Sequence, residues 1–300
     1  MATQAEISRT YDWIDEIFRL SMGEHGDFTC AFYDGDYSKT LEKAQADKHE
    51  YILNGIRFHA GLRVLDIGSG WGPMLRAVES KAGEAVGLTL SPAQARWCLK
   101  RGLKVLLQDY KTTDPQKLGM FDGVVSVGAF EHFCSISEFL AGKQEQIYQQ
   151  FFQFCASVLP PGGRLYLQTM TWGKAVPDPG LIEREHPAGS DEFHLKLATH
   201  FYPGSWLPSG LDQMKKCGEP SFDFISSNNG RLDYIKTLTE WGKRANKFSF
   251  KLLAAKVKLL PRYLADKEFR TQLRFVFNGS QSEIFKRNLF SHERMIFEKR

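Results

Sequence analysis

The sequence predicts an α/β fold built around a mostly parallel β-sheet. Short β-rich runs recur after Gly61, and helical stretches separate most of them, which is the pattern of consecutive βαβ units. The first run, Val64 to Ile67, leads at once into a glycine-rich turn, the order found where a parallel sheet binds a nucleotide. The 300 residues, of which 42% are hydrophobic, are enough for the core of one large domain.

The individual elements follow in order along the chain. Residues 1–60 are expected to be mainly helical, because positions from Leu41 to Ile52 keep a period near 3.6 residues. Strands are expected within residues 63–72, 84–91, 104–110, 121–128 and 164–170. Ser91 and Pro92 predict the start of a helix, and residues 160–163 predict a tight turn before the fifth strand. The last strand is expected at 294–298, with 221–225 as an antiparallel companion.

Two segments do not fit the sheet. Residues 172–210 are rich in proline and glycine, too irregular for a strand and long for a plain connection, so we interpret them as a cap or substrate loop. Residues 247–262 are predicted to form a helix with one basic face. That face consists of Lys247, Lys251, Lys258 and Arg262.

Composition argues against several classes of protein. Thirty-nine basic and 35 acidic residues leave a net charge of +4, too small a bias for a dedicated nucleic-acid binder. The sequence starts without an apolar leader, and no run reaches the roughly 18 apolar residues of a membrane span. The five cysteines are scattered with no CxxC pair, which favours reduced thiols over a disulfide frame or a zinc site. We therefore expect a cytoplasmic protein that binds neither nucleic acid nor metal.

Glycines at 68, 70 and 72 form the first candidate ligand site. They directly follow a strand, so the chain can turn sharply and a ligand can approach the backbone at a helix N-terminus. The pattern is GxGxG and not the GxGxxG of dinucleotide sites, and the next strand ends in Leu88-Thr89-Leu90 without an acid for a ribose. Thr89 and Gln94 offer weaker hydrogen bonds there.

Asp109 and Tyr110 follow the third predicted strand. At the carboxyl end of a parallel strand, an acid can accept a hydrogen bond from an adenine amino group while an aromatic ring lies on the base. A polar loop start would explain the two residues equally well. Together with the glycine turn, they describe an adenosine pocket without a pyrophosphate clamp, which favours S-adenosylmethionine over NAD.

Glu131 and His132 end the apolar stretch SVGAFEHF, which begins at Ser126. A carboxylate in such surroundings is costly to bury unless it is paired or used. A histidine here more often makes one structural hydrogen bond than takes part in catalysis. Both are candidate catalytic residues.

Several longer stretches resemble the cyclopropane fatty acid synthase family. The short form of that family comprises the mycolic acid cyclopropane synthases, which are S-adenosylmethionine-dependent methyltransferases acting on lipid double bonds. The matching stretches are FTCAFYDGDYSKTLEKAQADKHEYIL, VLDIGSGWGPML, VGLTLSPAQ, FDGVVSVGAFEHF, HFYPGSWLPS and DYIKTLTEW. The resemblance implies a class I, Rossmann-like methyltransferase fold with a seven-stranded, mostly parallel sheet, a helical N-terminal segment and a cap insertion.

We expect one methyltransferase domain, 1–300, in four parts. Residues 1–60 form a helical lid, 61–170 the cofactor-binding core and 171–220 a substrate cap. Residues 221–300 complete the core and carry the basic helix.

The resemblance also implies which residues bind the cofactor. They are Phe28, Thr29, Asp66, Gly68, Ser69, Gly70, Trp71, Gly72, Thr89, Leu90, Gln94, Asp109, Tyr110 and Val127. Phe28 stands where the family has a tyrosine, and Ser69 stands where a cysteine is usual. Both changes are mild, so we expect the cofactor to bind.

The implied chemistry is attack of an alkene on the sulfonium methyl group, followed by proton loss to a bound bicarbonate and ring closure. In the family, four positions hold the bicarbonate. Three are matched by the Cys30 backbone, Glu131 and Tyr234. The fourth is a histidine on the fifth strand that is Gln168 here, and an amide can donate to an anion but cannot carry a proton. We therefore expect a bound bicarbonate as a second cofactor, with Gln168 as the position that decides it.

The expected acceptor is the double bond of an unsaturated lipid acyl chain. Without a competent base, the cation would resolve to a branched, hydroxylated or exomethylene product in place of a ring. The alternative is methylation of a small amine or another non-lipid acceptor, and related plant amine methyltransferases keep a similar Glu-His pair. The basic face at 247–262, with Phe248, Phe250 and Leu252, is expected to make a peripheral membrane contact.

Overall fold

The computed structural model describes residues 20–23, 26–202, 204–277 and 279–300, and its centre is a seven-stranded sheet. The strands are β1 (Arg63–Ile67), β2 (Glu84–Thr89), β3 (Val105–Leu107), β4 (Gly123–Val127), β5 (Arg164–Trp172), β6 (Phe222–Asn229) and β7 (Phe290–Lys299). Their order is β3-β2-β1-β4-β5-β7-β6. The first five are parallel, and β7 runs antiparallel to both β5 and β6. The predicted α/β class and the predicted antiparallel pair are confirmed.

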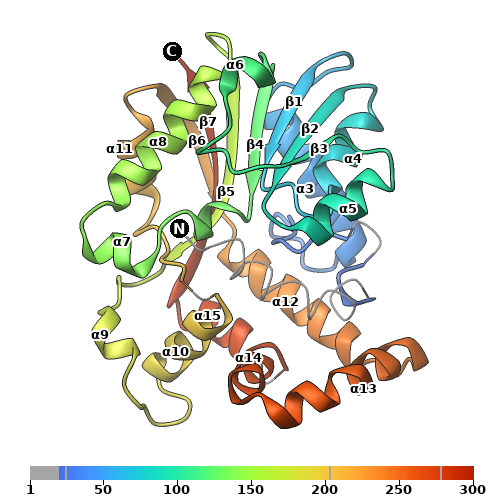
Figure 1. Ribbon diagram of the computed structural model, residues 1–300, viewed down its shortest axis with the longest axis vertical. Coiled ribbons are helices and arrows are strands. Elements are labelled where there is room, and N and C mark those ends of the chain that lie inside the picture. Colours follow the sequence, from blue (N-terminus) through green and yellow to red (C-terminus); the bar gives the residue numbers. More distant parts are fainter. Residues whose placement is uncertain (1–19, 24–25, 203, 278) are drawn as a thin grey trace.

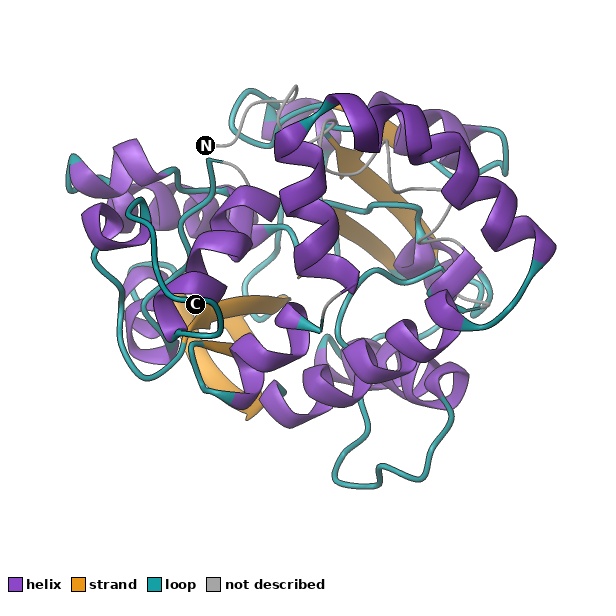
Figure 2. Cartoon of the chain, turned by 90° about the horizontal axis from the view of Figure 1, so that it is seen from below, coloured by secondary structure: helices purple, strands orange, loops and turns teal. Residues whose placement is uncertain are grey.

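Helices flank both faces of this sheet, and Figures 1 and 2 show them from two directions. They are α3 (Leu41–Gly55), α4 (Pro73–Glu79), α5 (Pro92–Leu99), α6 (Pro115–Leu118), α7 (Ile136–Leu140), α8 (Gln144–Ser157), α9 (Pro179–Ile182), α10 (Asp191–Phe201), α11 (Leu211–Gly218), α12 (Arg231–Asn246), α13 (Phe250–Ala265), α14 (Lys267–Phe277) and α15 (Ser280–Lys286), with a 3₁₀ turn, η1, at Phe130–His132. Helices α8 and α11 lie on one side of the sheet, and α3 to α5 lie on the other (Figure 1). The last four helices lie beyond the carboxyl ends of β1 and β4.

The strand order changes direction between β1 and β4, and this fixes the place for a ligand. Successive residues of β1 and of β4 are buried, so both faces of the sheet are covered here, as expected for parallel strands between layers of helices. The chain leaves β1 to one side and β4 to the other, so a crevice opens at their carboxyl ends. The glycine turn and the Glu131–His132 pair both follow these two strands.

Helix α3 begins at a capping threonine and packs one face on the sheet. The hydroxyl of Thr40 accepts from the Lys43 N–H, which satisfies one of the open donors of the first turn. The buried face includes Leu41, Ala44 and Ile52, as the period predicted. Lys48 lies on the same face and is also fully buried, which requires a charged partner.

The cap is more helical than its composition suggested. Ser190 caps α10, an 11-residue helix whose buried side includes Leu195 and Phe201. Helix α10 packs against α14 and α15, so the expectation of an irregular loop over 172–210 is wrong for this part. Proline and glycine remain in the connections that flank α10, where they end helices and form turns.

The predicted helix at 247–262 is wrong at its start. Helix α12 ends at Asn246, Lys247 has extended backbone, and α13 begins only at Phe250. A break at residues 247–249 separates the two helices, and each buries apolar residues of its own, Trp241 on α12 and Leu252 on α13. Lys247 therefore lies before the basic helix and not on it. Within the described residues, no helix is long and apolar enough to cross a membrane.

The N-terminal part of the predicted lid, residues 1–19, lies outside the described residues. Residues Asp27 to Cys30 form an irregular segment, here called the strap, and its first three residues line a cavity together with residues at the ends of β1 and β4. Thr29 lies so close to Gly128 that a Cβ there would be 2.7 Å from Thr29 Cγ2. The strap is thus the part of the predicted lid that reaches the crevice.

Candidate active site

A cavity opens at the carboxyl ends of β1, β2 and β4, under the strap. It is lined by the predicted cofactor residues Phe28, Thr29, Asp66, Gly68, Ser69, Gly70, Trp71, Thr89, Leu90, Gln94, Asp109, Tyr110 and Val127. Gly72 is the predicted cofactor residue that does not line it. Its backbone caps α4, and a Cβ there would lie 2.7 Å from Leu103 Cδ1. Gly72 therefore serves the packing of α4 against its neighbours.

The turn after β1 requires glycine at Gly68. Its φ is +85°, and a Cβ at this position would lie 2.2 Å from the Cβ of Ala129, just after β4. Its N–H donates to the Leu88 carbonyl at 2.9 Å, which ties the turn to β2. Gly70 also has positive φ, +54°, and no atom lies within 4 Å of the place that a Cβ would take, so its backbone is open to the cavity.

Thr89 and Gln94 form a hydrogen-bonded pair on the cavity wall. The Thr89 hydroxyl donates to Gln94 Oε1 at 2.9 Å and accepts from the Ser91 N–H at 3.2 Å. This bond fixes the orientation of the Gln94 amide and leaves its NH₂ group as a donor at the wall. Ser91 caps α5 by accepting from the Gln94 N–H, as predicted from the Ser-Pro pair.

Tyr110 lies in an aromatic cluster beside the cavity. Its ring contacts Phe133, Phe151 and Phe154 with centroid distances of 4.8, 5.6 and 5.6 Å. One carboxylate oxygen of Asp109 accepts from the Lys111 N–H at 3.0 Å, which shapes the turn after β3. These positions give the cavity an apolar aromatic wall next to a carboxylate, as an adenine site needs.

Asp27, on the strap, also lines the cavity, and the sequence analysis did not find it. Lys48 Nζ donates to Asp27 Oδ1 at 2.8 Å and to the Thr29 hydroxyl at 2.8 Å, and His49 Nε2 lies 3.0 Å from Asp27 Oδ2. Burial would raise the pKa of Asp27, but Lys48 and His49 hold it well below its usual range. The position of Lys48 on the apolar face of α3 was the sequence feature that could have predicted a buried carboxylate as its partner.

Lys48 also orients the Thr29 hydroxyl. The ammonium group of Lys48 can only donate, so the Thr29 oxygen is the acceptor in this hydrogen bond. The hydroxyl proton of Thr29 therefore does not point toward Lys48. Thr29 lines the cavity, so its hydroxyl is available as a donor to a ligand there.

Asp66 is a second buried carboxyl group at the cavity wall. Burial, together with the negative charge of Asp27, raises the pKa of Asp66 to about 7, against the lowering effect of Lys48. At neutral pH it is therefore a mixture of acid and carboxylate. A cationic ligand in the cavity would favour the carboxylate.

Glu131 bonds to β5 and is not among the residues that line the cavity. Its Oε1 accepts from the Met170 N–H at 2.9 Å, and Oε2 is buried with no hydrogen-bond partner among the described residues. Burial raises the pKa of Glu131 to about 7, against the lowering effect of the Met170 N–H. The carboxyl group thus accepts a backbone hydrogen bond from β5 two residues beyond its last pair with β4, which is Val127 with Gln168.

His132 lies in the same turn as Glu131 and lines the cavity. Its Nδ1 is 2.8 Å from the hydroxyl of Ser205, in the PGSW motif of the cap. Burial lowers the pKa of His132 to about 4, so the ring is neutral at ordinary pH. This contact joins two motifs that are distant in the sequence, the Glu131–His132 pair and the PGSW motif.

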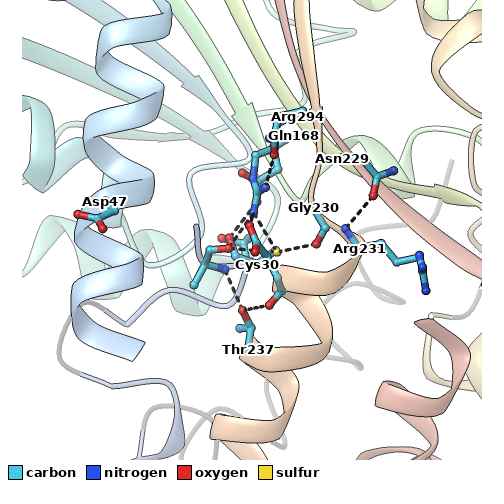
Figure 3. A network of polar contacts seen from close by, with 12 residues as sticks. Cys30, Asp47, Gln168, Asn229, Gly230, Arg231, Thr237 and Arg294 are labelled. Carbon is cyan, nitrogen blue, oxygen red and sulfur yellow. Dashed lines mark hydrogen bonds and ion pairs between the residues drawn. The ribbon is translucent and has the colours of Figure 1, made fainter. Parts of the chain in front are cut away.

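Cys30, Gln168 and Arg294 form a buried network under the strap (Figure 3). Gln168 Nε2 donates to the Cys30 carbonyl at 3.2 Å, and the Tyr166 hydroxyl donates to Gln168 Oε1 at 3.0 Å. Arg294 donates to the Ala31 carbonyl at 2.7 Å and lies 3.3 Å from Cys30 Sγ. Burial raises the pKa of the Cys30 thiol to about 12, so this side chain is an inert thiol.

Arg294 is fully buried and is paired with Asp233 at 2.9 Å, on the helix that carries Tyr234. The sequence analysis missed this pair because the two residues are far apart in the chain. Tyr234 packs against Phe285 and edge-on against His292, with centroid distances of 4.6 and 5.2 Å. His292 was also missed, and its buried Nδ1 has no hydrogen-bond partner among the described residues. The available signal was a histidine two residues before the strand predicted at 294–298.

The candidate catalytic residues therefore divide into two groups. His132 lines the cavity, whereas Cys30, Glu131, Gln168 and Tyr234 do not. Cys30 is the last residue of the strap and bonds to Gln168 on β5, and Glu131 bonds to Met170 on the same strand. Tyr234 lies on α12.

Comparison with known proteins gives the family. A family model described as mycolic acid cyclopropane synthetase matches residues 1–264. The chain belongs to this family. Cyclopropane mycolic acid synthase 3 of Mycobacterium tuberculosis is 32% identical over 242 residues, which cover 77% of this chain and 78% of that protein. Hydroxymycolate synthase MmaA4 of Mycobacterium bovis is 31% identical over 248 residues, covering 79% and 76%.

A solved relative agrees over the whole chain. Mycolic acid cyclopropane synthase CmaA1, complexed with SAH and CTAB, has 26% sequence identity and a TM-score of 0.78, with 99% of each chain covered. The fold is that of the class I methyltransferases, as the sequence predicted. The resemblance to the cyclopropane synthase family is confirmed.

Proposed function

We propose that this protein is an S-adenosylmethionine-dependent methyltransferase that transfers a methyl or methylene group to the double bond of an unsaturated lipid acyl chain. The observation that carries the proposal is the cavity at the carboxyl ends of β1 and β4. Its lining unites the residues predicted to bind the cofactor in a chain of the mycolic acid cyclopropane synthetase family.

The residues present fit the cofactor. The open backbone at Gly70, the oriented hydroxyl of Thr29 and the Gln94 amide supply donors, while Asp66 supplies a carboxyl group for a cationic centre. Tyr110 contributes to an apolar wall suited to a base. When bound, S-adenosylmethionine supplies an electrophilic methyl group to the double bond.

Glu131 is the residue we propose to accept a proton from the methylated chain. Methylation leaves a carbocation on the acyl chain, and loss of a proton from the added methyl group lets that C–H electron pair close the ring. A carbocation is so strong an acid that a carboxylate with a pKa near 7 is base enough. The buried Oε2 without a hydrogen-bond partner among the described residues supports this role, and dry surroundings protect the cation from water.

Bicarbonate fits the expected residues only in part. The Oε2 atom of Glu131, with no partner in the described part of the chain, favours an additional polar group nearby. Against it, the Gln168 amide already bonds to Tyr166 and to the Cys30 carbonyl, two of the groups that an anion would have to displace or share. The binding of bicarbonate therefore stays a prediction.

Two further parts of the proposal concern the acceptor. CmaA1 has been solved with CTAB, a long-chain amphiphile, which supports an acyl chain as acceptor in this chain as well. We propose that the acceptor is presented at a membrane surface from the cytoplasmic side, where thiols such as the five free cysteines stay reduced.

Transfer of a labelled methyl group tests the proposal. The purified protein is incubated with methyl-labelled S-adenosylmethionine and with dispersed phospholipids that carry either unsaturated or fully saturated acyl chains. We expect label in the unsaturated lipid alone. A small secondary amine serves as a third acceptor, and label in the amine but not in the lipid would reject the proposal in favour of an N-methyltransferase.

A further inference from the structure

Helix α13 has two apolar faces on opposite sides. Leu252 and Ala255 are buried, and Leu259 packs beside them against the cluster that contains Trp241. The outer apolar residues are Phe250, Leu253, Val257, Leu260 and Leu264, and Phe248 precedes them. Their exposed fractions range from 50% to 79%.

The spacing of the outer residues makes them one continuous stripe. They recur at intervals of three and four residues along α13, so they share one side of the helix. Phe248 and Phe250 touch each other at a centroid distance of 5.3 Å, which extends the stripe past the start of the helix. We call Phe248 and the five outer residues of α13 the outer stripe. The surfaces of soluble proteins rarely expose so many large apolar side chains in one patch.

The charged residues from Lys243 to Ala265 are all basic, because this range contains no Asp or Glu. Lys247, Lys251 and Lys258 are exposed, and the last two lie on α13 beside the stripe. Arg262, predicted to belong to the same basic face, pairs with Asp266 at 3.6 Å. The surface thus complements an anionic partner that also accepts apolar groups.

The position of α13 suits contact with a flat partner. The helix lies at the edge of the molecule farthest from the sheet, beyond α12 (Figure 1). With 16 residues and an internal proline, it is too short to cross a bilayer. An amphipathic helix with aromatic and aliphatic residues on one side and lysines beside them binds in the plane of the interface.

We propose that the outer stripe, with Lys247, Lys251 and Lys258, docks this protein on the surface of an anionic lipid bilayer. The inference rests on the proposed function and deepens it, because docking would bring the protein to acyl chains in a bilayer, but bilayer binding does not depend on methyl transfer. A second copy of the chain is the less suitable occupant, since symmetric pairing of this face would bring its lysines together.

Vesicle flotation of the full-length protein tests the proposal. Vesicles of phosphatidylcholine alone are compared with vesicles that contain 30% phosphatidylglycerol. We expect the wild-type protein to float at least tenfold more efficiently with the anionic vesicles. The triple variant Leu253→Gln, Val257→Gln, Leu260→Gln should lose at least tenfold of that binding.

Two matched variants separate the contributions. Lys251→Gln with Lys258→Gln should abolish the preference for anionic vesicles. Leu140→Gln with Leu232→Gln changes two exposed leucines on α7 and α12, at 68% and 54% exposure, and should leave binding unchanged. All substituted side chains are exposed, so circular dichroism should show each variant folded.

Three results would overturn the proposal. They are absence of wild-type binding to anionic vesicles, unchanged binding by the triple variant, or a wild-type dimer in light scattering that the triple variant abolishes without any vesicle binding. Methyl transfer to detergent-dispersed unsaturated lipid is measured in parallel. Transfer without vesicle binding would reject this inference and leave the proposed function standing. Vesicle binding without transfer would reject the proposed function and leave this inference standing.

Discussion

Lys48 shows how a single buried charge supports the cavity wall. The ammonium group is fully buried, and it bonds both to Asp27 and to the Thr29 hydroxyl. A buried ion pair adds little net stability compared with apolar residues, but removal of one partner leaves the other charge uncompensated. The contacts of Lys48 therefore fix the strap in the position from which Phe28 and Thr29 reach the cavity.

Replacement of Lys48 by methionine tests this role. Lys48→Met should destabilise the protein by about 3–5 kcal/mol, because the Asp27 carboxylate loses its ammonium partner in a buried place. Lys43→Met is the matched control. Lys43 is exposed and pairs with Asp47 one helical turn away, so its loss should change the free energy of unfolding by only about 0.5 kcal/mol.

Urea denaturation of both variants gives the two values. Calorimetric titration with S-adenosylmethionine of folded Lys48→Met should also show weaker binding than in Lys43→Met. Equal stability of the two variants would contradict the role of Lys48.

The pKa of Glu131 near 7 makes a prediction about stability. Below its usual value of 4.5 the group is protonated in both states, and between 4.5 and about 7 only the folded protein keeps the proton. Stability from this group is therefore present at low pH and is lost as the pH rises through about 7. Replacement by glutamine removes the titrating group.

The free energies of unfolding of wild type and Glu131→Gln should be compared at pH 5 and pH 8. The wild-type value minus the variant value should fall by about 2–3 kcal/mol over this range. At pH 8, Glu131→Gln should bind S-adenosylmethionine nearly as wild type does but transfer its methyl group about 10²–10⁴-fold more slowly. Unchanged turnover would remove Glu131 from the catalytic proposal.

At the scale of single elements, the turn after β1 depends on Gly68. Gly68→Ala would combine a strained positive φ with overlap against Ala129, and we expect a loss of roughly 2–5 kcal/mol and at least tenfold in cofactor affinity. Gly102→Ala is the control, because Gly102 has a similar φ of +78° with no atom within 4 Å of the added Cβ. It should lose about 1 kcal/mol and keep its cofactor affinity. Denaturation and calorimetry measure both, and equal effects would contradict the overlap.

Sequence patterns predicted the elements that local chemistry determines. Apolar runs bounded by glycine and proline predicted the strands, and Ser91-Pro92 predicted the start of α5. Two features escaped this reasoning because they depend on distant packing. Helix α10 forms where its apolar side meets α14 and α15, and α13, which packs Leu252 and Ala255 in the core, is separated from α12 by a break at residues 247–249.

At the scale of the whole molecule, the two parts of the site differed in how far sequence could predict them. Most of the cofactor residues lie at or just after strand ends, so the order of β1, β2, β3 and β4 brings them to one cavity. The catalytic candidates meet through contacts that join the strap, β5, β7 and α12. Sequence alone could not place Arg294 opposite Gln168, since that register arises from the antiparallel pairing of β5 with β7.

The product made with S-adenosylmethionine that carries a CD₃ methyl group tests the central claim most directly. Mass spectrometry of the unsaturated lipid counts the deuterium atoms that stay on the added carbon. Methylation of the double bond followed by proton loss and ring closure predicts an added carbon with two deuterium atoms and no remaining double bond. Three retained deuterium atoms on a nitrogen or oxygen of the acceptor, with the double bond intact, would contradict the account.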